Sequence, residues 1–462
     1  SMSIIIPANS AVAGGYDVEN SCRFDGTAAY LNRTQGTSTN LTKFAWSGWI
    51  KRSKLGADQT VTMNYASASN YGYFYFRSGD DIRIFDRGAG GDTVAISDML
   101  FRDTSAWYHI ALIIDTTQAT DTNRLKLYVN GILQGLNGVT YPAENAALGW
   151  KVANTSNTFL MRTNSADGYV GGYLAEVAYV DGTANAITDF GEFDADSGIW
   201  KPIDVSGLTF GNEGYYLDFK DSANLGNDVT GGTDFTENSL AAIDQTTDVP
   251  TNNFATINPL VKAASAIPLS EGNTVATFPS GWIGLPATFG MQSGKWYWEQ
   301  KVLATNGGNI NMGIVNENLD WDASDTMVAT TGAFYYFCSG RKIINNSATE
   351  GFFASYTTND IISIALDLDA STPTIIFYKN GTATPNSTPL ELPANLNSSL
   401  FTFPYFIGNS SSAAANWSAN FGNPSFSISS SNADGNGYGN FEYAVPSGYL
   451  ALCTKNLSEV LS

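Results

Sequence analysis

The sequence predicts an all-β fold built from two jelly-roll β-sandwiches. Three observations support this: apolar side chains alternate with period two along many short segments, Asn-Gly pairs follow two of these segments, and no amphipathic helix of useful length is found. Period-two alternation is typical of a strand with one buried face, and Asn-Gly is a preferred two-residue hairpin turn. Close strand spacing with Gly, Asn, Asp and Ser between strands favours sandwiches over alternating strands and helices.

Two hairpins are the clearest local predictions. Residues 125–129 place Leu and Val on one side and Lys and Tyr on the other, directly before Asn130-Gly131. Residues 374–378 lead to Asn380-Gly381 in the same way, after an apolar alternation over residues 362–368. Because the two stretches are alike, we expect two domains of related architecture. Further strands are expected over residues 44–51, 73–77, 82–85, 108–115, 173–180, 296–302 and 310–315.

The length of 462 residues indicates two or three domains, since one hydrophobic core seldom serves so long a chain. We expect a first sandwich over residues 1–200, a connecting segment over 201–268 and a second sandwich with a C-terminal tail over 269–462. The connection is rich in Asp, Asn, Thr and Gly, and its strand-like residues 215–219 predict that it packs on one or both domains. Cys22, Cys338 and Cys453 form no paired motif, so we expect buried thiols.

Charge limits the choice of partner. The chain has 23 basic and 43 acidic residues, a net charge of -20, which repels phosphate backbones and anionic lipid surfaces. Nucleic acid and membrane are therefore excluded as expected partners. No apolar run approaches the roughly 18 residues needed to span a bilayer, and the first residues are too short for a signal peptide, so neither an anchor nor a signal peptide is expected.

Four motifs in the first part of the chain occur in a recognisable order. They are FDGTAAYL at residues 24–31, FAWSGWIKRS at 44–53, WYHIALIID at 107–115 and LKLYVNG at 125–131. In that order, over about residues 20–185, the chain resembles the concanavalin A-like lectin/glucanase superfamily, in its laminin-G and pentraxin-like branch. The resemblance implies a concanavalin-like jelly-roll sandwich, closed by the strand YLAEVAYVDG at residues 173–182.

The second part resembles a SPRY domain, another concanavalin-like sandwich used for protein recognition. The motifs are SGKWYWE at residues 293–299, INMGIV at 310–315, DIISIALDLD at 360–369 and FYKNG at 377–381. Two further segments, PTNNFATINPL at 250–260 and VPSGYLALCTKNL at 445–457, make the chain similar to structural proteins of tailed bacteriophages. That likeness implies a virion location, in the tail or its fibres.

Together the resemblances imply a non-catalytic virion protein for host-surface attachment or virion assembly. The expected partners are a host-surface glycan or protein and other virion proteins, with a homo-oligomer possible in principle and no cofactor required. Two alternatives stay open at this point: a glycan-degrading enzyme of the concanavalin-like glucanase type, and a secreted bacterial adhesin. Fold alone does not choose among them.

Catalytic residues are not expected. Laminarinase-type relatives carry acidic residues in the order E-x-D-x-x-E, so that two carboxyl groups flank the sugar bond. Here only Glu192 and Asp194 begin such a motif, Ser197 replaces its last acid, and flanking glycines suggest an exposed acidic loop. His109 is the single histidine, and its place in a predicted strand favours a hydrogen-bonded structural role.

A calcium ion is the one metal that the composition allows. Asp320, Asp322 and Asp325 bring three carboxylates into six residues, and carboxylates are preferred calcium ligands. The glycine of an EF-hand loop is missing, however, and solvent alone is able to screen these charges. A stabilising but inessential calcium ion and a solvated acidic loop are both open interpretations.

Exposed aromatic residues in loops are candidates for ligand binding, because sugar rings stack on them while nearby carboxylates accept hydroxyl hydrogen bonds. For Trp321, between Asp320 and Asp322, core and binding roles are equally open. Other tryptophans are expected in the cores, namely Trp46, Trp49, Trp107, Trp296 and Trp298. The remaining ligand-binding candidates are Tyr71, Tyr73, Trp150 and Trp417.

Overall fold

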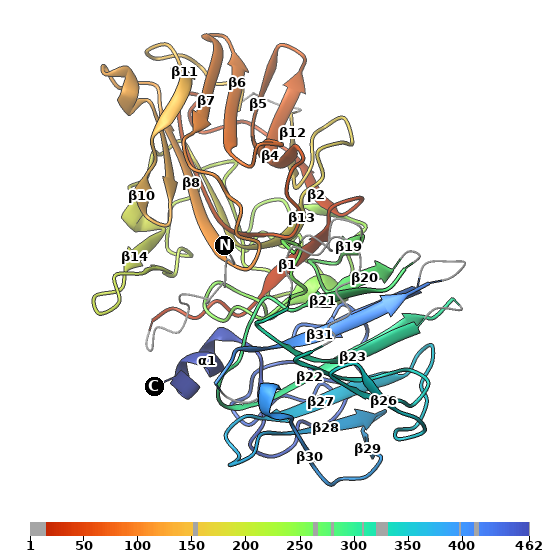
Figure 1. Cartoon of the computed structure of the whole chain (residues 1–462). Helices are drawn as coiled ribbons and strands as arrows, with labels where there is room; N and C mark the ends of the chain where they lie inside the picture. The colour runs from red at the N-terminus through yellow and green to blue at the C-terminus, as the bar shows by residue number, and fades with distance from the viewer. Residues whose placement is uncertain are drawn as a thin grey trace. The chain divides into compact units, whose positions relative to one another are not determined.

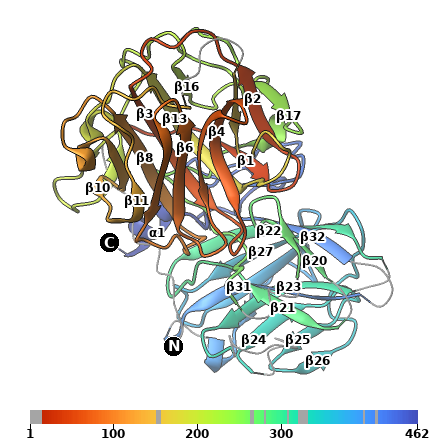
Figure 2. The ribbon, with the colours of Figure 1, turned by 90° about the horizontal axis from the view of Figure 1, so that it is seen from above.

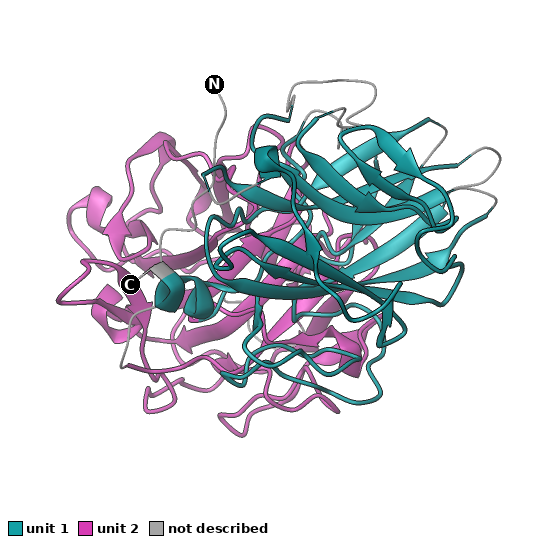
Figure 3. Ribbon diagram, turned by 60° about the horizontal axis from the view of Figure 1, so that its bottom comes forward, with its two compact units in different colours: residues 1–11, 252–462 teal, residues 12–251 magenta. Residues whose placement is uncertain are grey.

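The computed structural model describes residues 15–150, 156–261, 267–278, 281–306, 309–319, 331–396, 399–410 and 415–461. The chain divides into unit 2, residues 12–251, and unit 1, residues 1–11 and 252–462 (Figure 3). Both units are β-sandwiches, so the predicted all-β class with two sandwiches is confirmed.

The described part contains one α-helix, α1 (Thr454–Leu461), which the sequence pattern did not predict. Short 3-10 helices occupy Asp121–Asn123, Ile187–Asp189, Ala242–Asp244 and Ala394–Leu396. Within these ranges, no helix has the length and apolar character needed to cross a bilayer.

Unit 2 has two large sheets, which we call the β3 sheet and the β5 sheet (Figure 1). The β3 sheet has the order β10 (Ile132–Leu133), β9 (Leu125–Val129), β8 (Trp107–Asp115), β3 (Lys43–Arg52), β13 (Gly171–Asp181), β1 (Ser21–Asp25), β18 (Gln245–Thr246), with β16 (Tyr215–Leu217) also paired to β13. The β5 sheet has the order β11 (Leu136–Thr140), β7 (Gly91–Ser97), β6 (Ile82–Gly88), β5 (Asn70–Phe76), β4 (Gln59–Ser67), β12 (Asn157–Leu160), β2 (Tyr30–Thr34), β17 (Thr236–Asn238). A separate hairpin joins β14 (Gly191–Phe193) and β15 (Trp200–Pro202).

The core of unit 2 lies between these two sheets. Trp46 and Ile110 of the β3 sheet share one buried cluster with Phe74 and Ile84 of the β5 sheet. The alternation that buries every second side chain is the one that predicted the strands. The outer side of the β3 sheet is buried as well, under apolar residues of the 185–205 and 245–251 segments.

Unit 1 also has two sheets, which form separate layers (Figure 2). The first has the order β19 (Leu269–Ser270), β20 (Val275–Phe278), β32 (Ala415–Asn420), β22 (Lys295–Ala304), β27 (Ile361–Asp367), β28 (Thr374–Lys379), β29 (Thr382–Thr384), with β30 (Leu390–Glu391) paired to β28 and β33 (Leu450–Ala451) paired to β22. The second has the order β21 (Ile283–Pro286), β31 (Thr402–Asn409), β23 (Asn309–Asn316), β24 (Ala333–Tyr336), β25 (Lys342–Ile344), β26 (Ser347–Thr349). Their inner sides share one large apolar cluster.

The two predicted hairpins are confirmed. Strand β9 pairs with β10, and β28 pairs with β29. Asn130 and Gly131 have φ angles of 47° and 76°, and Asn380 and Gly381 have 48° and 75°. A type I′ turn requires this left-handed conformation at both central residues, which Asn and Gly adopt with little strain.

The C-terminal segment of unit 1 is held to its sandwich at two places. Phe254 and Cys453 form an antiparallel bridge, and the Ala255 N–H donates to the Leu452 carbonyl at 3.1 Å. Glu299, on β22, accepts hydrogen bonds from the N–H groups of Glu442 and Tyr443 at 3.0 and 2.9 Å. These two hydrogen bonds to a buried side chain hold residues 442 and 443 against strand β22.

The domain boundary differs from the expected one. The expected connecting segment, residues 201–268, is divided between the units at Thr251 and Asn252. Its first part adds strands β16 and β18 to the β3 sheet and β17 to the β5 sheet. The segment packs in the sandwiches, as the strand-like residues 215–219 indicate, but it is not a separate linker. Cys22 and Cys453 are buried as predicted, whereas Cys338 is half-buried.

Candidate functional site

The outer side of the β5 sheet is the surface of unit 2 that its own chain leaves without a core. On β5, Phe74 and Phe76 point into the sandwich core, so Tyr71, Tyr73 and Tyr75 lie on the opposite side. We call this surface the aromatic face and define it by Met63, Tyr65, Tyr71, Tyr73, Tyr75, Phe85 and Phe159. In the described part of the chain, none of these seven side chains belongs to an apolar core cluster. Four of them nevertheless are buried, because Met63, Tyr75, Phe85 and Phe159 are each 8% exposed or less. The half-buried Tyr65, Tyr71 and Tyr73 are the accessible members.

Strand register arranges the aromatic face in rows. Directly opposed residues on neighbouring strands form one continuous middle row, which reads Asn32, Phe159, Met63, Tyr73, Phe85 and Val94. A second row beside it reads Thr34, Asn157, Tyr65, Tyr71, Arg87 and Asp92. The apolar row is therefore bordered by polar side chains, as in the ligand sites of many proteins.

Ring contacts join five residues of the aromatic face into a platform, namely Tyr65, Tyr71, Tyr73, Tyr75 and Phe85. The ring centroids of Tyr71 and Tyr73 are 6.0 Å apart, those of Tyr73 and Tyr75 are 5.2 Å apart, and both pairs are stacked. Tyr71 also stacks on Phe85 at 5.4 Å. Burial among these neighbours raises the pKa of Tyr73, so its hydroxyl stays protonated at neutral pH. Stacked rings hold each other in place and lose little rotational freedom on binding.

Three arginines border the aromatic face. Arg87 lies over the Tyr71 ring, with 5.5 Å from its guanidinium carbon to the centroid, and forms a bidentate ion pair with Asp92 at 2.8 and 2.6 Å. Arg83 lies 5.6 Å over Phe85 and donates to the Tyr75 hydroxyl at 3.4 Å. Arg162 lies 5.1 Å over Phe159 at the other end of the aromatic face.

The platform has a rigid support underneath. Trp150 packs against the inner side of Gly72, where an added Cβ would lie 2.1 Å from the indole ring. The backbone N–H of Trp150 donates to the Asp86 side chain at 2.9 Å, and the Asn64 side chain donates to the backbone carbonyl of Trp150 at 2.6 Å. Burial raises the pKa of Asp86 to about 7, although the Trp150 and Gly149 N–H groups partly offset it.

Two of the predicted ligand-binding tryptophans are core residues. Trp150 is 1% exposed and Trp417 is 0% exposed, so the expectation that they lie exposed in loops is wrong. Trp417 lies on β32 and stacks on Phe406 at 4.3 Å, inside the unit 1 core. Tyr71 and Tyr73 are half-buried, as a ligand site allows, but they lie on a strand instead of a loop.

Asp320, Trp321, Asp322 and Asp325 lie outside the described residues, so the proposed calcium site and the role of Trp321 stay predictions. Among the residues that the structure does describe, no group of three or more His, Cys, Asp or Glu side chains is arranged to hold a metal ion.

His109 is structural, as predicted. It is fully buried, its Nε2 is 2.8 Å from the Ser47 hydroxyl, and its Nδ1 accepts from the Trp200 indole N–H at 3.0 Å. Because Nδ1 accepts, the neutral ring holds its proton on Nε2. Burial lowers the pKa of His109 to about 3, so the ring is uncharged at neutral pH.

The expected exposed acidic loop is present only in part, because the Glu192 side chain is 57% exposed but the Asp194 side chain is only 9% exposed. Glu192 lies on the short strand β14, and Asp194 is buried and accepts hydrogen bonds from Ser197 at 2.8 and 2.9 Å. Both carboxylates pair with Lys201, at 3.2 and 3.5 Å. The hairpin between β14 and β15 brings Lys201 opposite Glu192, and this pairing could not be read from the chain order.

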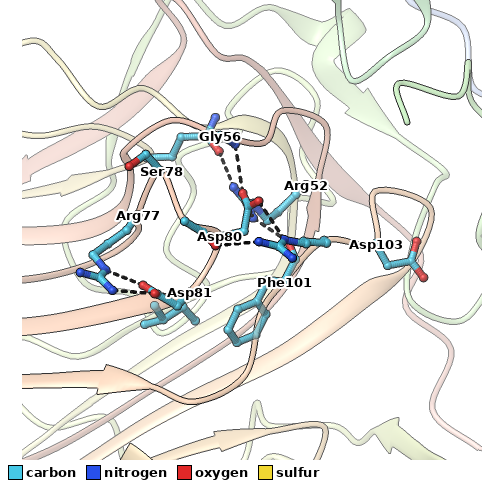
Figure 4. A network of polar contacts seen from close by, with 12 residues as sticks. Arg52, Gly56, Arg77, Ser78, Asp80, Asp81, Phe101 and Asp103 are labelled. Atoms are coloured by element: carbon cyan, nitrogen blue, oxygen red, sulfur yellow. Dashed lines mark hydrogen bonds and ion pairs between the residues drawn. The ribbon is translucent and has the colours of Figure 1, made fainter. Parts of the chain in front are cut away.

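A second arginine-rich region lies at one end of the unit 2 sandwich (Figure 4). Asp80 accepts from Arg52 at 3.3 Å and from the Gly56 N–H at 3.0 Å, while Arg77 forms a bidentate pair with Asp81 at 2.5 and 2.6 Å. Arg52 also donates to the Phe101 carbonyl at 2.6 Å. Most of these donors and acceptors pair with one another, although the buried Arg52 Nε has no partner among the described atoms, so the network ties the loops of the sandwich together.

Sequence comparison agrees with this architecture. The profile of the concanavalin A-like lectin/glucanases superfamily, in its laminin-G form, matches residues 25–186, and the SPRY domain profile matches residues 295–414. Unit 2 therefore contains a concanavalin A-like domain of the laminin-G type, and unit 1 contains a SPRY domain. No curated protein sequence matches the chain.

Solved structures similar to the chain include domains of both kinds. The SPRY domain of human HERC1 is 22% identical and covers 35% of this chain and 96% of its own, with a TM-score of 0.27. The SAP-like pentraxin of Limulus polyphemus is 13% identical, with 44% and 94% coverage and a TM-score of 0.30. Domains LG4-5 of the mouse laminin alpha1 chain are 10% identical, with 90% and 91% coverage and a TM-score of 0.33.

Proposed function

We propose that this chain is a non-catalytic recognition protein of a tailed-phage virion, located in the tail or its fibres, and that the aromatic face of unit 2 contacts a glycan or protein of the host surface. The observation that carries the proposal is the group of half-buried outward tyrosines on the β5 sheet, Tyr65, Tyr71 and Tyr73, whose rings contact one another. Aromatic rings stack on the C–H faces of sugars, and Tyr and Arg are enriched among residues that dominate protein interfaces.

The contrast with the other outer side of unit 2 supports this assignment. There, aromatic residues such as Trp49 and Trp107 are covered by Trp200 and Val249 of the same chain. The β5 sheet instead has aromatic residues on both sides, which adds nothing to the sandwich core. The partly accessible residues of this side are tyrosines, which combine an apolar ring with a polar hydroxyl and are enriched at interfaces.

The phage assignment has separate support. Two segments are similar to phage structural proteins, residues 250–260 and 445–457, and they lie almost 200 positions apart. In unit 1 they are neighbours, through the bridge between Phe254 and Cys453 and the hydrogen bond from the Thr454 N–H to the Asn253 carbonyl at 2.9 Å. They therefore make up one structural feature of unit 1, on which the proposed relation to phage proteins rests.

The binding part of the proposal is tested with Tyr73→Ala. Binding to host cells and to immobilised surface glycans should fall while the melting temperature stays close to that of the wild type. Tyr378→Ala, which removes a half-buried tyrosine from unit 1, is the matched control and should bind normally. If Tyr73→Ala binds as well as the wild type does, the aromatic face is not the contact surface.

The two remaining parts of the proposal need their own tests. Purified particles of the phage that encodes the chain should contain the protein by mass spectrometry, and its absence would contradict the virion role. Incubation with laminarin and alginate should release no reducing ends. Turnover that is lost on Glu192→Gln or Asp194→Asn would instead establish an enzyme.

A further inference from the structure

The arginines of the chain differ in their pairing. Eight of the ten lie within 4.0 Å of a carboxylate, among them Arg52, Arg77 and Arg87. Over the described residues, Arg83 and Arg162 have no such partner. An unpaired guanidinium in a chain with a net charge of -20 is unusual, because 43 acidic residues compete to pair with 23 basic ones.

Both unpaired arginines border the aromatic face. Arg83 lies on β6 opposite Tyr75, and Arg162 lies two residues after the end of β12, the strand that contributes Phe159 to the middle row. In addition, the Nε of each is buried and has no hydrogen-bond partner among the described atoms. The ion-paired Arg23, Arg33 and Arg52 share this feature, so Arg83 and Arg162 are distinguished by the missing carboxylate and not by the buried Nε.

Aromatic contacts hold the two arginines in position. The Arg162 guanidinium lies 3.7 Å from the Tyr30 ring centroid and donates to the Tyr169 hydroxyl at 3.2 Å. Arg83 is held in a similar way by Phe85 and the Tyr75 hydroxyl. Cation–π contacts fix the planar group without neutralising its charge, which leaves it able to bind a carboxylate with two parallel hydrogen bonds.

The third arginine of the platform lacks this capacity. Arg87 is already neutralised by Asp92, and its own ion pair raises its pKa. Positive charge therefore remains at two points only, on β6 and after β12. Strands β6 and β12 are three strand spacings apart in the sheet, so the two guanidinium groups are separated by about 14 Å. A single sugar ring is too short to reach both.

We infer that the aromatic face binds a linear acidic polysaccharide, whose sugar rings stack on the half-buried Tyr71 and Tyr73 while two of its carboxylates pair with Arg83 and Arg162. The inference rests on the proposed function and specifies its ligand. It follows from charge complementarity: the platform accepts sugar rings, and its two free charges are both positive. The overall negative charge of the chain opposes such a ligand, so binding depends on these two residues.

The experiment measures binding of alginate, a polymer of sugar carboxylates, and of laminarin, a neutral polymer, by affinity electrophoresis. Arg83→Gln and Arg162→Gln should each weaken alginate binding about tenfold, and the double variant more, because a hydrogen bond to a charged group is lost. Arg102→Gln is the control: it removes the same charge from an exposed arginine of unit 2, outside the aromatic face, and should bind as the wild type does.

The outcomes separate the inference from the proposed function. If alginate binding survives in the double variant, or if dextran sulfate binds as tightly as alginate, recognition of sugar carboxylates is refuted. If Tyr73→Ala abolishes binding of laminarin and alginate alike while the arginine variants change neither, the aromatic face stands and the inference fails. If the folded protein binds neither host cells nor any glycan, the proposed function fails as well.

Discussion

The two outer sides of unit 2 show how one sandwich uses the same residue types differently. On the β3 sheet, outward residues such as Trp49 and His109 lie beneath Trp200, which belongs to a later segment of the chain. On the β5 sheet, Phe85 is 7% exposed and Trp107 of the other sheet is 8% exposed, but Phe85 packs among residues of its own sheet and not under a later segment. The outward rings of Tyr71 and Tyr73 stay half-buried. The first surface is covered by the fold, whereas the second keeps these two rings partly accessible to a partner.

The difference teaches that outward aromatic residues have to be interpreted together with what covers them. A covered aromatic residue contributes buried apolar area, and its loss lowers the free energy of unfolding. An uncovered one stabilises the fold little and becomes valuable when a ligand buries it. The four predictions below test whether the two sides of unit 2 differ in this way.

The largest effect is expected for Trp200→Ala. Trp200 is 6% exposed and packs over Gly131 and Gly191, so truncation leaves a cavity and removes the hydrogen bond to His109. The free energy of unfolding should fall by about 3–5 kcal/mol in a denaturant titration. If Trp200→Ala is no less stable than Tyr73→Ala, the distinction between a covered and an uncovered side is wrong.

Stability should depend on pH through Asp86, beneath the aromatic face. Its pKa is raised from 3.8 to about 7 in the folded protein, so the folded state binds more protons than the unfolded state between these values. Its contribution is therefore present at low pH and is lost as pH rises from 3.8 towards 7, by at most about 4 kcal/mol.

Asp86→Asn should remove this dependence, which is measured as the difference in unfolding free energy between variant and wild type across the pH range.

His109, under Trp200, should affect the pH dependence of stability with the opposite sign. Its pKa is lowered from 6.5 to about 3, so its contribution is present above 6.5 and is lost as pH falls towards 3. If the unfolding free energies of Asp86→Asn and of His109→Gln differ from the wild-type value by the same amount at every pH, the shifted pKa values of both residues are contradicted.

Tyr73→Ala should change binding more than stability. Removing a central aromatic residue from an interface typically costs about 2 kcal/mol, which is roughly thirtyfold in affinity. Its unfolding free energy should change by about 1 kcal/mol or less, because its ring touches no core cluster. Calorimetric binding and thermal melting, measured on the same sample, decide the matter. Early melting without a loss of affinity would place Tyr73 with the core.

The smallest effect is expected for Arg102→Gln, at the end of the sandwich. Its side chain is 60% exposed, and its ion pair with Asp80, at 3.4 Å, is one of several contacts to that carboxylate. Exposed ion pairs contribute less than about 1 kcal/mol. Denaturant titration should therefore give nearly the wild-type value, and a larger loss would show that the network in Figure 4 depends on this residue.

Much of the fold could be predicted from the sequence because the relevant forces are local. Period-two alternation located strands such as β3 and β8, and Asn130 and Asn380 marked hairpin turns because the turn requires a left-handed backbone. Of the candidate site, Tyr71 and Tyr73 were predicted. A signal for Tyr75 was present in the alternation of Tyr with buried Phe along β5, which indicates a strand with two aromatic sides.

What the sequence determined by itself was the all-β class, the two sandwiches and the structural role of His109, since each depends on short-range pattern or on the scarcity of one residue type. The tertiary structure decided which aromatic residues are free. Trp150 and Trp417 look like loop or edge residues in the chain, but strands far away in sequence bury them. Arg83 and Arg162 are ordinary arginines in the sequence. Only strand pairing places both beside one row of rings and away from every described carboxylate, because contacts across a sheet depend on register and not on chain order.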